Sequence, residues 1–203
     1  MVAHEASARY WAMGQAWFAG GGCGWPLPLT TPARQLRHCL ALAILGKAMV
    51  TDAIKIRDVR RSDFDQWLPL WDGYNAFYKR VGPTALSMEV TRTTWARFFD
   101  HYEPVHCLVA EATGKLIGLV HYIFHRSTTM LGPTCYLQDL FTSKEARGKG
   151  VGRGLIIAVY ERATSAGSTR VYWQTHESNV AAQRLYDTIA ERSGFIVYRK
   201  DLS

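Results

Sequence analysis

A glycine-rich stretch with basic residues between its glycines constrains the fold of this chain more than any other feature. The stretch ARGKGVGRG follows the strand-like run CYLQDLF, and an amphipathic run over Val151–Ser165 comes next. Apolar residues at helical spacing predict that this second run is a helix. The glycines therefore lie at a strand-to-helix junction, where the free N–H groups and positive dipole of the helix can meet an anion. Because glycine also lets a backbone approach closely, we interpret the stretch as a phosphate-binding loop.

The spacing of the glycines excludes two common phosphate motifs. Arg153 and Leu155 stand where GxGxxG requires glycine, and GxxxxGK[ST] is not matched. The remaining motif is RxxGxG, formed by Arg147, Gly150 and Gly152. Alone it is also compatible with a flexible basic loop, but its place between a strand and a helix favours the phosphate cradle.

Hydrophobic periodicity predicts an α/β (α+β) fold with a mixed central sheet of about six to seven strands flanked by helices. The predicted order is β-α-α-β-β-β-α-β-α-β. The predicted strands cover residues 54–59, 105–112, 115–125, 135–143, 169–176 and 195–200. The predicted helices cover residues 62–79, 90–102, 151–165 and 179–191.

Residues 1–50 differ in composition from residues 51–203. They contain the breaker-rich run AGGGCGWPLPLTTP and a single acidic residue, Glu5. We therefore predict an N-terminal extension over 1–50, either poorly ordered or a packed helix, that is not part of the domain formed by 51–203. An apolar run within it is interrupted by Lys47, and no apolar run in the chain reaches membrane-spanning length.

The net charge and the cysteine content indicate which kinds of partner, metal and compartment to expect. The net charge of +7 favours an anionic partner such as nucleic acid or a phosphate-bearing cofactor. The four cysteines form no CxxC pair and no His-Cys group has zinc spacing, so we expect no bound metal. Free thiols are typical of a reducing compartment, and we expect a cytoplasmic protein.

From Ile54 to Leu202 the chain resembles the GCN5-related N-acetyltransferases, the GNAT family. RGKGVG matches their acetyl-CoA loop [RQ]xxGx[GA], and NVAAQRLYDTIAERSGFIVY resembles a later family signature. HCLVAE, YLQDLF and RLYD resemble the branch that holds spermidine/spermine acetyltransferases and fungal acetyltransferases acting on histones, polyamines or D-amino acids. The resemblance implies the GNAT fold and direct acetyl transfer from acetyl-CoA to a primary amine of a polyamine, amino acid or peptide.

The resemblance also implies catalytic roles. Tyr186 matches the general acid that protonates the leaving thiolate, although a tyrosine beside Leu185 is also expected in a core. Close relatives often carry glutamate where this chain has Gln138, and glutamine cannot accept the proton of an amine. Asp139 is then either the base, acting through water, or a structural residue. Strand alternation sends Gln138 and Asp139 to opposite faces.

Cofactor and acceptor residues follow from the same resemblance. The implied cofactor-binding residues are Leu140, Phe141, Thr142, Arg147, Gly148, Lys149, Gly150, Val151, Gly152, Arg153 and Asn179. Asn179 is equally suited to cap a helix, and both roles can hold. The implied acceptor-site residues are Trp71, Asp72, Tyr74 and Gln138. His121 and His125 share a strand face, and we expect them to be solvated or to face the substrate.

Two other functions remain open at this point. A basic protein with an RG-containing loop can bind nucleic acid, but the chain has neither RNP-type aromatic motifs nor a helix-turn-helix. We therefore expect no nucleic-acid partner. Because Gln138 cannot act as a base, the protein could instead be a sensor that binds acyl-CoA and turns it over little. Because family members often dimerise, the resemblance leaves a homodimer open as well.

Overall fold

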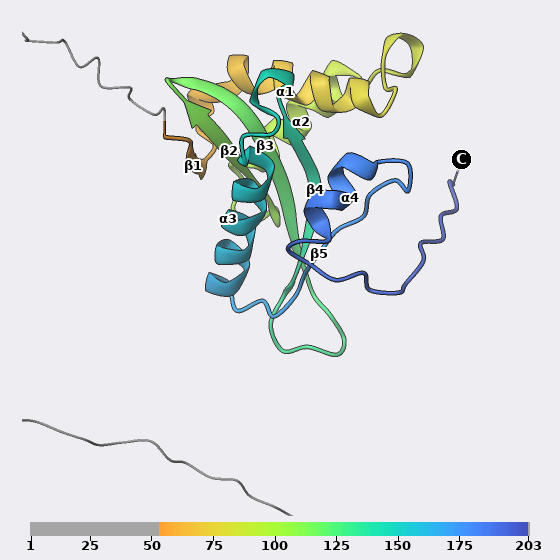
Figure 1. The fold of residues 1–203 in the computed structure, drawn as a ribbon. Coiled ribbons are helices and arrows are strands. Elements are labelled where there is room, and N and C mark those ends of the chain that lie inside the picture. Colours follow the sequence, from red (N-terminus) through yellow and green to blue (C-terminus); the bar gives the residue numbers. More distant parts are fainter. Residues whose placement is uncertain (1–52, 203) are drawn as a thin grey trace, which may run out of the picture. The chain divides into compact units, whose positions relative to one another are not determined.

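A computed structural model describes residues 53–202 of the chain (Figure 1). The predicted extension over 1–50 lies outside these residues, and its separation from the domain stays a prediction. Five strands form one sheet in the order β1-β2-β3-β4-β5. The strands are β1 Lys55–Asp58, β2 Val105–Ala112, β3 Lys115–His125, β4 Thr134–Thr142 and β5 Val171–Tyr172. β1 to β4 pair antiparallel, whereas β5 runs parallel to β4.

Four α-helices and three short 3-10 turns complete the described fold. The helices are α1 Phe64–Phe77, α2 Met88–Arg97, α3 Val151–Ser165 and α4 Val180–Tyr186. The 3-10 turns are Arg61–Asp63, Gly82–Thr84 and Lys144–Ala146. The structure confirms a mixed sheet flanked by helices and the predicted order of its elements as far as α4.

Each face of the sheet carries its own core. α3 packs on one face, where Leu155, Ile156 and Val159 are fully buried against β2, β3 and β4. α1 covers the other face (Figure 1). It contributes Trp67 and Trp71 to a second cluster, and Trp95 of α2 packs against them. This second, aromatic-rich core is the one that surrounds the polar groups described below.

The predicted final strand over 195–200 is wrong. In the described part of the chain this segment forms no strand, and Phe195 and Tyr198 are exposed (Figure 1). Gly194 takes a φ of 77°, which turns the chain before the apolar run begins. β5 is only two residues long, so it offers little ladder for another strand to join. The strand predicted over 169–176 is likewise reduced to Val171–Tyr172.

The two faces leave no room for a side chain at Gly118 in β3. A methyl group there would lie 3.0 Å from the Phe141 carbonyl oxygen, 3.0 Å from Val151 Cγ1 and 3.2 Å from Leu155 Cδ1. We expect Gly118→Ala to lower the free energy of unfolding by about 1–3 kcal/mol, because backbone and buried side chains must move. Chemical denaturation measures this. Gly152→Ala is the control, since its nearest contact would be an ordinary 3.5 Å, to Leu185. Equal losses in the two variants would contradict the packing described.

Candidate active site

β4 and β5 separate soon after they begin to pair. Their parallel ladder joins only Cys135 to Val171 and Tyr136 to Tyr172. β4 continues to Thr142 along β3, so on its other side the backbone of residues 140–142 has no neighbouring strand within the described chain. This opening leaves N–H and C=O groups available to an extended ligand, in the way that a missing strand would use them.

The glycine loop sits at the end of the same strand and opens α3. Gly148 and Gly150 have φ values of 74° and 79°, a backbone region that glycine adopts without strain. A methyl group at either position would meet nothing within 4 Å, so the loop presents bare backbone. The first N–H groups of α3, from Val151 onward, have no intrahelical acceptor. The loop therefore fits a diphosphate group, as the sequence predicts.

The three basic residues of the loop have different surroundings. Arg147 Nε donates to the Thr142 carbonyl at 3.4 Å, which folds the loop back on β4. Arg153 Nη1 donates to Thr188 Oγ1 at 3.1 Å and ties α3 to the segment after α4. Lys149 is exposed. The loop thus has two charged side chains with structural contacts and one that points to solvent.

A buried hydrogen-bonded chain links β4, β3 and α1. His121 Nδ1 lies 2.9 Å from Asp139 Oδ2, and Trp67 Nε1 donates to His121 Nε2 at 3.1 Å. An indole N–H can only donate, so Nε2 must be unprotonated and Nδ1 carries the proton that Asp139 accepts. His121 is accordingly a neutral imidazole fixed in one tautomer. His121 and Asp139 are both buried, with 2% and 7% exposure. The expectation of a solvated or substrate-facing His121 is therefore wrong.

A β-bulge places Asp139 on this face. His121 pairs with Asp139 but Tyr122 pairs with Leu137, so Gln138 is an extra residue in β4. Leu137 packs under α3, whereas Asp139, two residues later, faces α1. Simple alternation would send both to the same face. Gln138 itself is exposed.

Two tyrosines, Tyr74 of α1 and Tyr78 directly after that helix, lie near the Asp139 carboxylate. Burial, together with the negative charge of the carboxylate, raises the pKa of Tyr74. Burial and the same carboxylate also raise the pKa of Tyr78. The centroids of the two rings lie 5.0 Å apart. Asp139 is therefore a buried carboxylate that accepts from the His121 imidazole N–H and has two phenol rings nearby.

The predicted acceptor residues of α1 differ in exposure. Trp71 is buried and stacks on Trp67 and Tyr74, with ring centroids 5.7 Å and 5.4 Å apart. Its Nε1–H is buried and has no hydrogen-bond partner within the described chain. A buried donor without a partner is costly, so this group is suited to a water or ligand oxygen. Asp72 lies on the exposed side of the same helix.

Tyr186 is the last residue of α4. It is partly buried, and its ring meets Trp173 edge-on at 5.3 Å. Burial raises the pKa of Tyr186 to about 12, and Tyr78 adds to the shift. The catalytic roles of Tyr186 and Asp139 stay predictions.

Asn179 caps α4. Its Oδ1 accepts from the Ala182 N–H at 3.4 Å, and its Nδ2 donates to Thr175 Oγ1 at 3.3 Å. The capping role predicted for this residue is confirmed. Its predicted contact with the cofactor stays a prediction.

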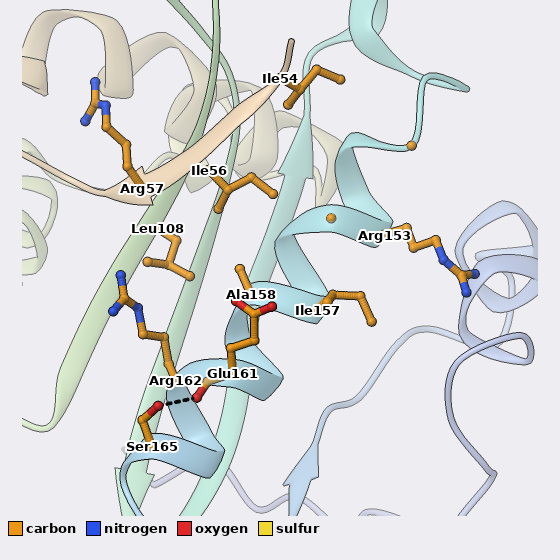
Figure 2. Close-up of a pocket in the computed structure, with 12 residues that line it drawn as sticks. Ile54, Ile56, Arg57, Leu108, Arg153, Ile157, Ala158, Glu161, Arg162 and Ser165 are labelled. Atoms are coloured by element: carbon orange, nitrogen blue, oxygen red, sulfur yellow. Dashed lines mark hydrogen bonds between the residues drawn. The ribbon is translucent and has the colours of Figure 1, made fainter. Parts of the chain in front are cut away.

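A separate groove of about 700 Å³ runs between β1 and α3 (Figure 2). Of the predicted site residues, only Gly150 and Arg153 line it. Figure 2 shows the Arg153 side chain pointing away from the groove. Neither Asp139 nor Tyr186 lies there, so the volume of a groove alone does not locate the chemistry of this protein.

Within residues 53–202, no three His, Cys, Asp or Glu side chains are grouped as a metal site. The same range contains no helix long and apolar enough to cross a membrane.

The acetyltransferase (GNAT) family model matches residues 67–190, more than half of the chain. The matched span contains Asp139, the glycine loop and Tyr186. The chain belongs to the GNAT family of acetyltransferases. It is an acetyl-CoA-dependent N-acetyltransferase that acts on an amine, which confirms the activity implied by the sequence motifs.

Relatives of known activity lie in the GNAT branch that the motifs indicated. A D-amino-acid N-acetyltransferase of Saccharomyces cerevisiae is 37% identical over 155 residues, covering 75% of this chain and 94% of the yeast protein. A thialysine N-epsilon-acetyltransferase of Mus musculus is 28% identical over 160 residues, covering 71% of this chain and 91% of the mouse protein.

Solved structures confirm the GNAT fold. An aminoglycoside N-acetyltransferase in complex with CoA has a TM-score of 0.62 at 16% identity, covering 73% of this chain and 94% of its own. A ribosomal-protein-alanine N-acetyltransferase from Brucella melitensis also has a TM-score of 0.62, at 18% identity. The match covers 74% of this chain and 99% of the Brucella chain.

The tautomer of His121 is directly measurable in this GNAT protein. We expect ¹⁵N-histidine NMR to show a proton bonded to Nδ1 and none on Nε2, because the Trp67 indole donates to Nε2. Comparison with His121→Asn assigns the signal. A proton on Nε2 would contradict the hydrogen-bonded chain described here.

Proposed function

We propose that this N-acetyltransferase holds the acceptor amine against the Asp139 carboxylate and protonates the departing CoA thiolate from Tyr186. The observation that carries the proposal is the buried Asp139 carboxylate, hydrogen-bonded to a neutral His121, on the strand that separates from β5. Direct attack on a thioester needs an acceptor for the amine proton and a donor for the thiolate. Asp139 and Tyr186 are proposed to meet these two needs.

Asp139 is the proposed base. Because His121 is neutral, the pair carries one negative charge beneath the rings of Trp71 and Tyr74. That charge attracts an ammonium group and takes its proton, either directly or through one water, to leave a neutral amine. Gln138 is proposed to contact the acceptor by hydrogen bonds alone, since an amide cannot accept the proton. With a buried carboxylate next to Gln138, the glutamine no longer argues for a sensor without turnover.

Tyr186 is the proposed acid. Its pKa of about 12 keeps the hydroxyl protonated at any ordinary working pH. It can therefore donate a proton to the thiolate as the carbon–sulfur bond breaks. A core tyrosine would share the burial and the contact with Trp173, but the match of RLYD to the family motif supports the catalytic role.

The proposed cofactor site joins the opening in the sheet to the glycine loop. The backbone of Leu140, Phe141 and Thr142 is proposed to pair with the pantetheine arm and to stabilise negative charge on the acetyl oxygen through an N–H group. The N–H groups of residues 147–153 are proposed to hold the pyrophosphate, with Lys149 adding positive charge. Asn179 is proposed to contact the cofactor from the start of α4.

The proposed acceptor is a small amine, either an amino acid or a polyamine, or the amine of a peptide. Trp71 and Tyr74 are proposed to form the wall of its site, and Asp72 to attract it at the mouth. The yeast and mouse relatives are described by activity on D-amino acids and thialysine, which supports the amino-acid class.

We infer a cytoplasmic enzyme, supported by the free, buried thiols of Cys107 and Cys135. We infer no nucleic-acid partner, since the basic loop is suited to the cofactor's phosphates. We also propose a homodimer, because members of this family often dimerise.

The activity is tested by release of CoA thiol from acetyl-CoA across polyamines, L- and D-amino acids and lysine peptides. We expect release with one class of amine, and a fall in kcat of about 10²- to 10⁴-fold in Tyr186→Phe, because the acid is removed. Tyr122→Phe is the control, since Tyr122 is a buried tyrosine on the opposite face of the sheet from Asp139. Equal rates in Tyr186→Phe and the wild-type protein would refute the role of Tyr186.

A further inference from the structure

We propose that the acceptor is an amino acid and that Arg80 binds its carboxylate while Asp139 receives its amine. The inference rests on the proposed function of Asp139 and adds an anion-binding residue to the acceptor site. Arg80 follows α1 at the turn into the next segment and is the third residue after Phe77, the last of that helix.

The structure holds the Arg80 guanidinium in place from two sides. Its Nη1 donates to Asn75 Oδ1 at 3.1 Å, and the guanidinium carbon lies 5.5 Å from the centre of the Tyr78 ring. Asn75 is itself buried and donates through Nδ2 to the Trp71 carbonyl at 2.9 Å. Asn75 is thereby oriented with its oxygen toward Arg80, which limits the freedom of a long and otherwise exposed side chain.

The backbone supports the same placement. Lys79 has a φ of 59°, a left-handed conformation that a residue with a side chain adopts at some cost. This turn returns the chain so that the Arg80 N–H donates to the Asn75 carbonyl at 3.0 Å. The end of α1 is therefore shaped to bring Arg80 back over Tyr78 rather than to continue into solvent.

Arg80 has no carboxylate partner among residues 53–202. Five arginines in that range are paired with Asp or Glu side chains, namely Arg57, Arg97, Arg162, Arg192 and Arg199, and Arg80 is among those that are not. What orients Arg80 is its hydrogen bond to Asn75 together with its place over the Tyr78 ring. A guanidinium that is oriented but lacks an ion pair retains N–H donors for a carboxylate ligand, which it can bind with two parallel hydrogen bonds.

A continuous run of ring contacts connects Arg80 to Asp139. The Arg80 guanidinium lies over the Tyr78 ring, the Tyr78 and Tyr74 ring centroids are 5.0 Å apart, and Tyr74 stacks on Trp71. The Trp71 ring lies 5.2 Å from that of His121, the hydrogen-bond partner of Asp139. Burial and the Asp139 carboxylate raise the pKa of both tyrosines, and the charge of Arg80 opposes that shift. A carboxylate and a guanidinium at the two ends of one group of aromatic rings match the ammonium and carboxylate groups of an amino acid. A polyamine would instead bring a second cation toward Arg80, which is unfavourable.

Matched pairs of acceptors test this inference. Lysine is compared with cadaverine, and each enantiomer of phenylalanine with phenethylamine, so that each pair differs by one carboxylate. We expect the wild-type protein to prefer the carboxylate-bearing member in kcat/KM by about 10- to 100-fold, the range of a charge-assisted hydrogen bond. In Arg80→Gln we expect that preference to vanish through KM, with kcat/KM for the decarboxylated amine within about twofold of wild type.

Two further variants sharpen the test. Arg80→Lys keeps the charge without the planar fork, and we expect it to retain part of the preference. Arg61→Gln is the matched control, because Arg61 also lies over an aromatic ring, 4.6 Å from Phe99, and we expect it to keep the full preference. Equal use of both members of each pair, or a preference unchanged in Arg80→Gln, would overturn the inference and leave the proposed function standing. Absence of thiol release with any amine would overturn the proposed function together with it.

Discussion

The hydrogen bond between His121 and Asp139 is the interaction on which the account of this site depends. A carboxylate that is 7% exposed beneath tryptophan rings is costly unless its oxygens are satisfied. His121 supplies one N–H, and Trp67 fixes the tautomer that makes the imidazole a donor to Asp139. The aromatic residues of α1 thus form part of the core and also surround the His121–Asp139 pair.

The bulge at Gln138 and the separation of β4 from β5 place the Asp139 carboxylate beside an open strand edge. The bulge turns Asp139 to the face covered by α1, and the separation leaves the next residues of β4 open to an extended ligand. The glycine loop that follows opens α3, whose first N–H groups are suited to a phosphate. In the proposed site, one short segment of chain therefore positions both cofactor and acceptor.

Much of this could be predicted from the sequence, because the loop, the helices and the family motifs are local patterns. The bulge could not be predicted, because strand alternation alone places Leu137 and Asp139 on one face of the sheet. Only the pairing of β4 with β3 shows that Gln138 is an extra residue. His121 was missed as a buried partner because its neighbours Trp67 and Asp139 are distant in sequence. The last strand was wrongly predicted from an apolar run at 195–200 that finds no partner strand in the described fold.

The most direct test of the central claim is kcat/KM of Asp139→Asn for the acceptor amine as a function of pH. The amide keeps the shape and can still accept from His121, so only the charge and the proton acceptor are lost. The account predicts a fall of about 10²- to 10⁴-fold near neutral pH that shrinks as alkaline pH deprotonates the free amine, with KM for acetyl-CoA unchanged. An unchanged kcat/KM across the pH range would contradict it, and Asp139 would then be a structural residue only.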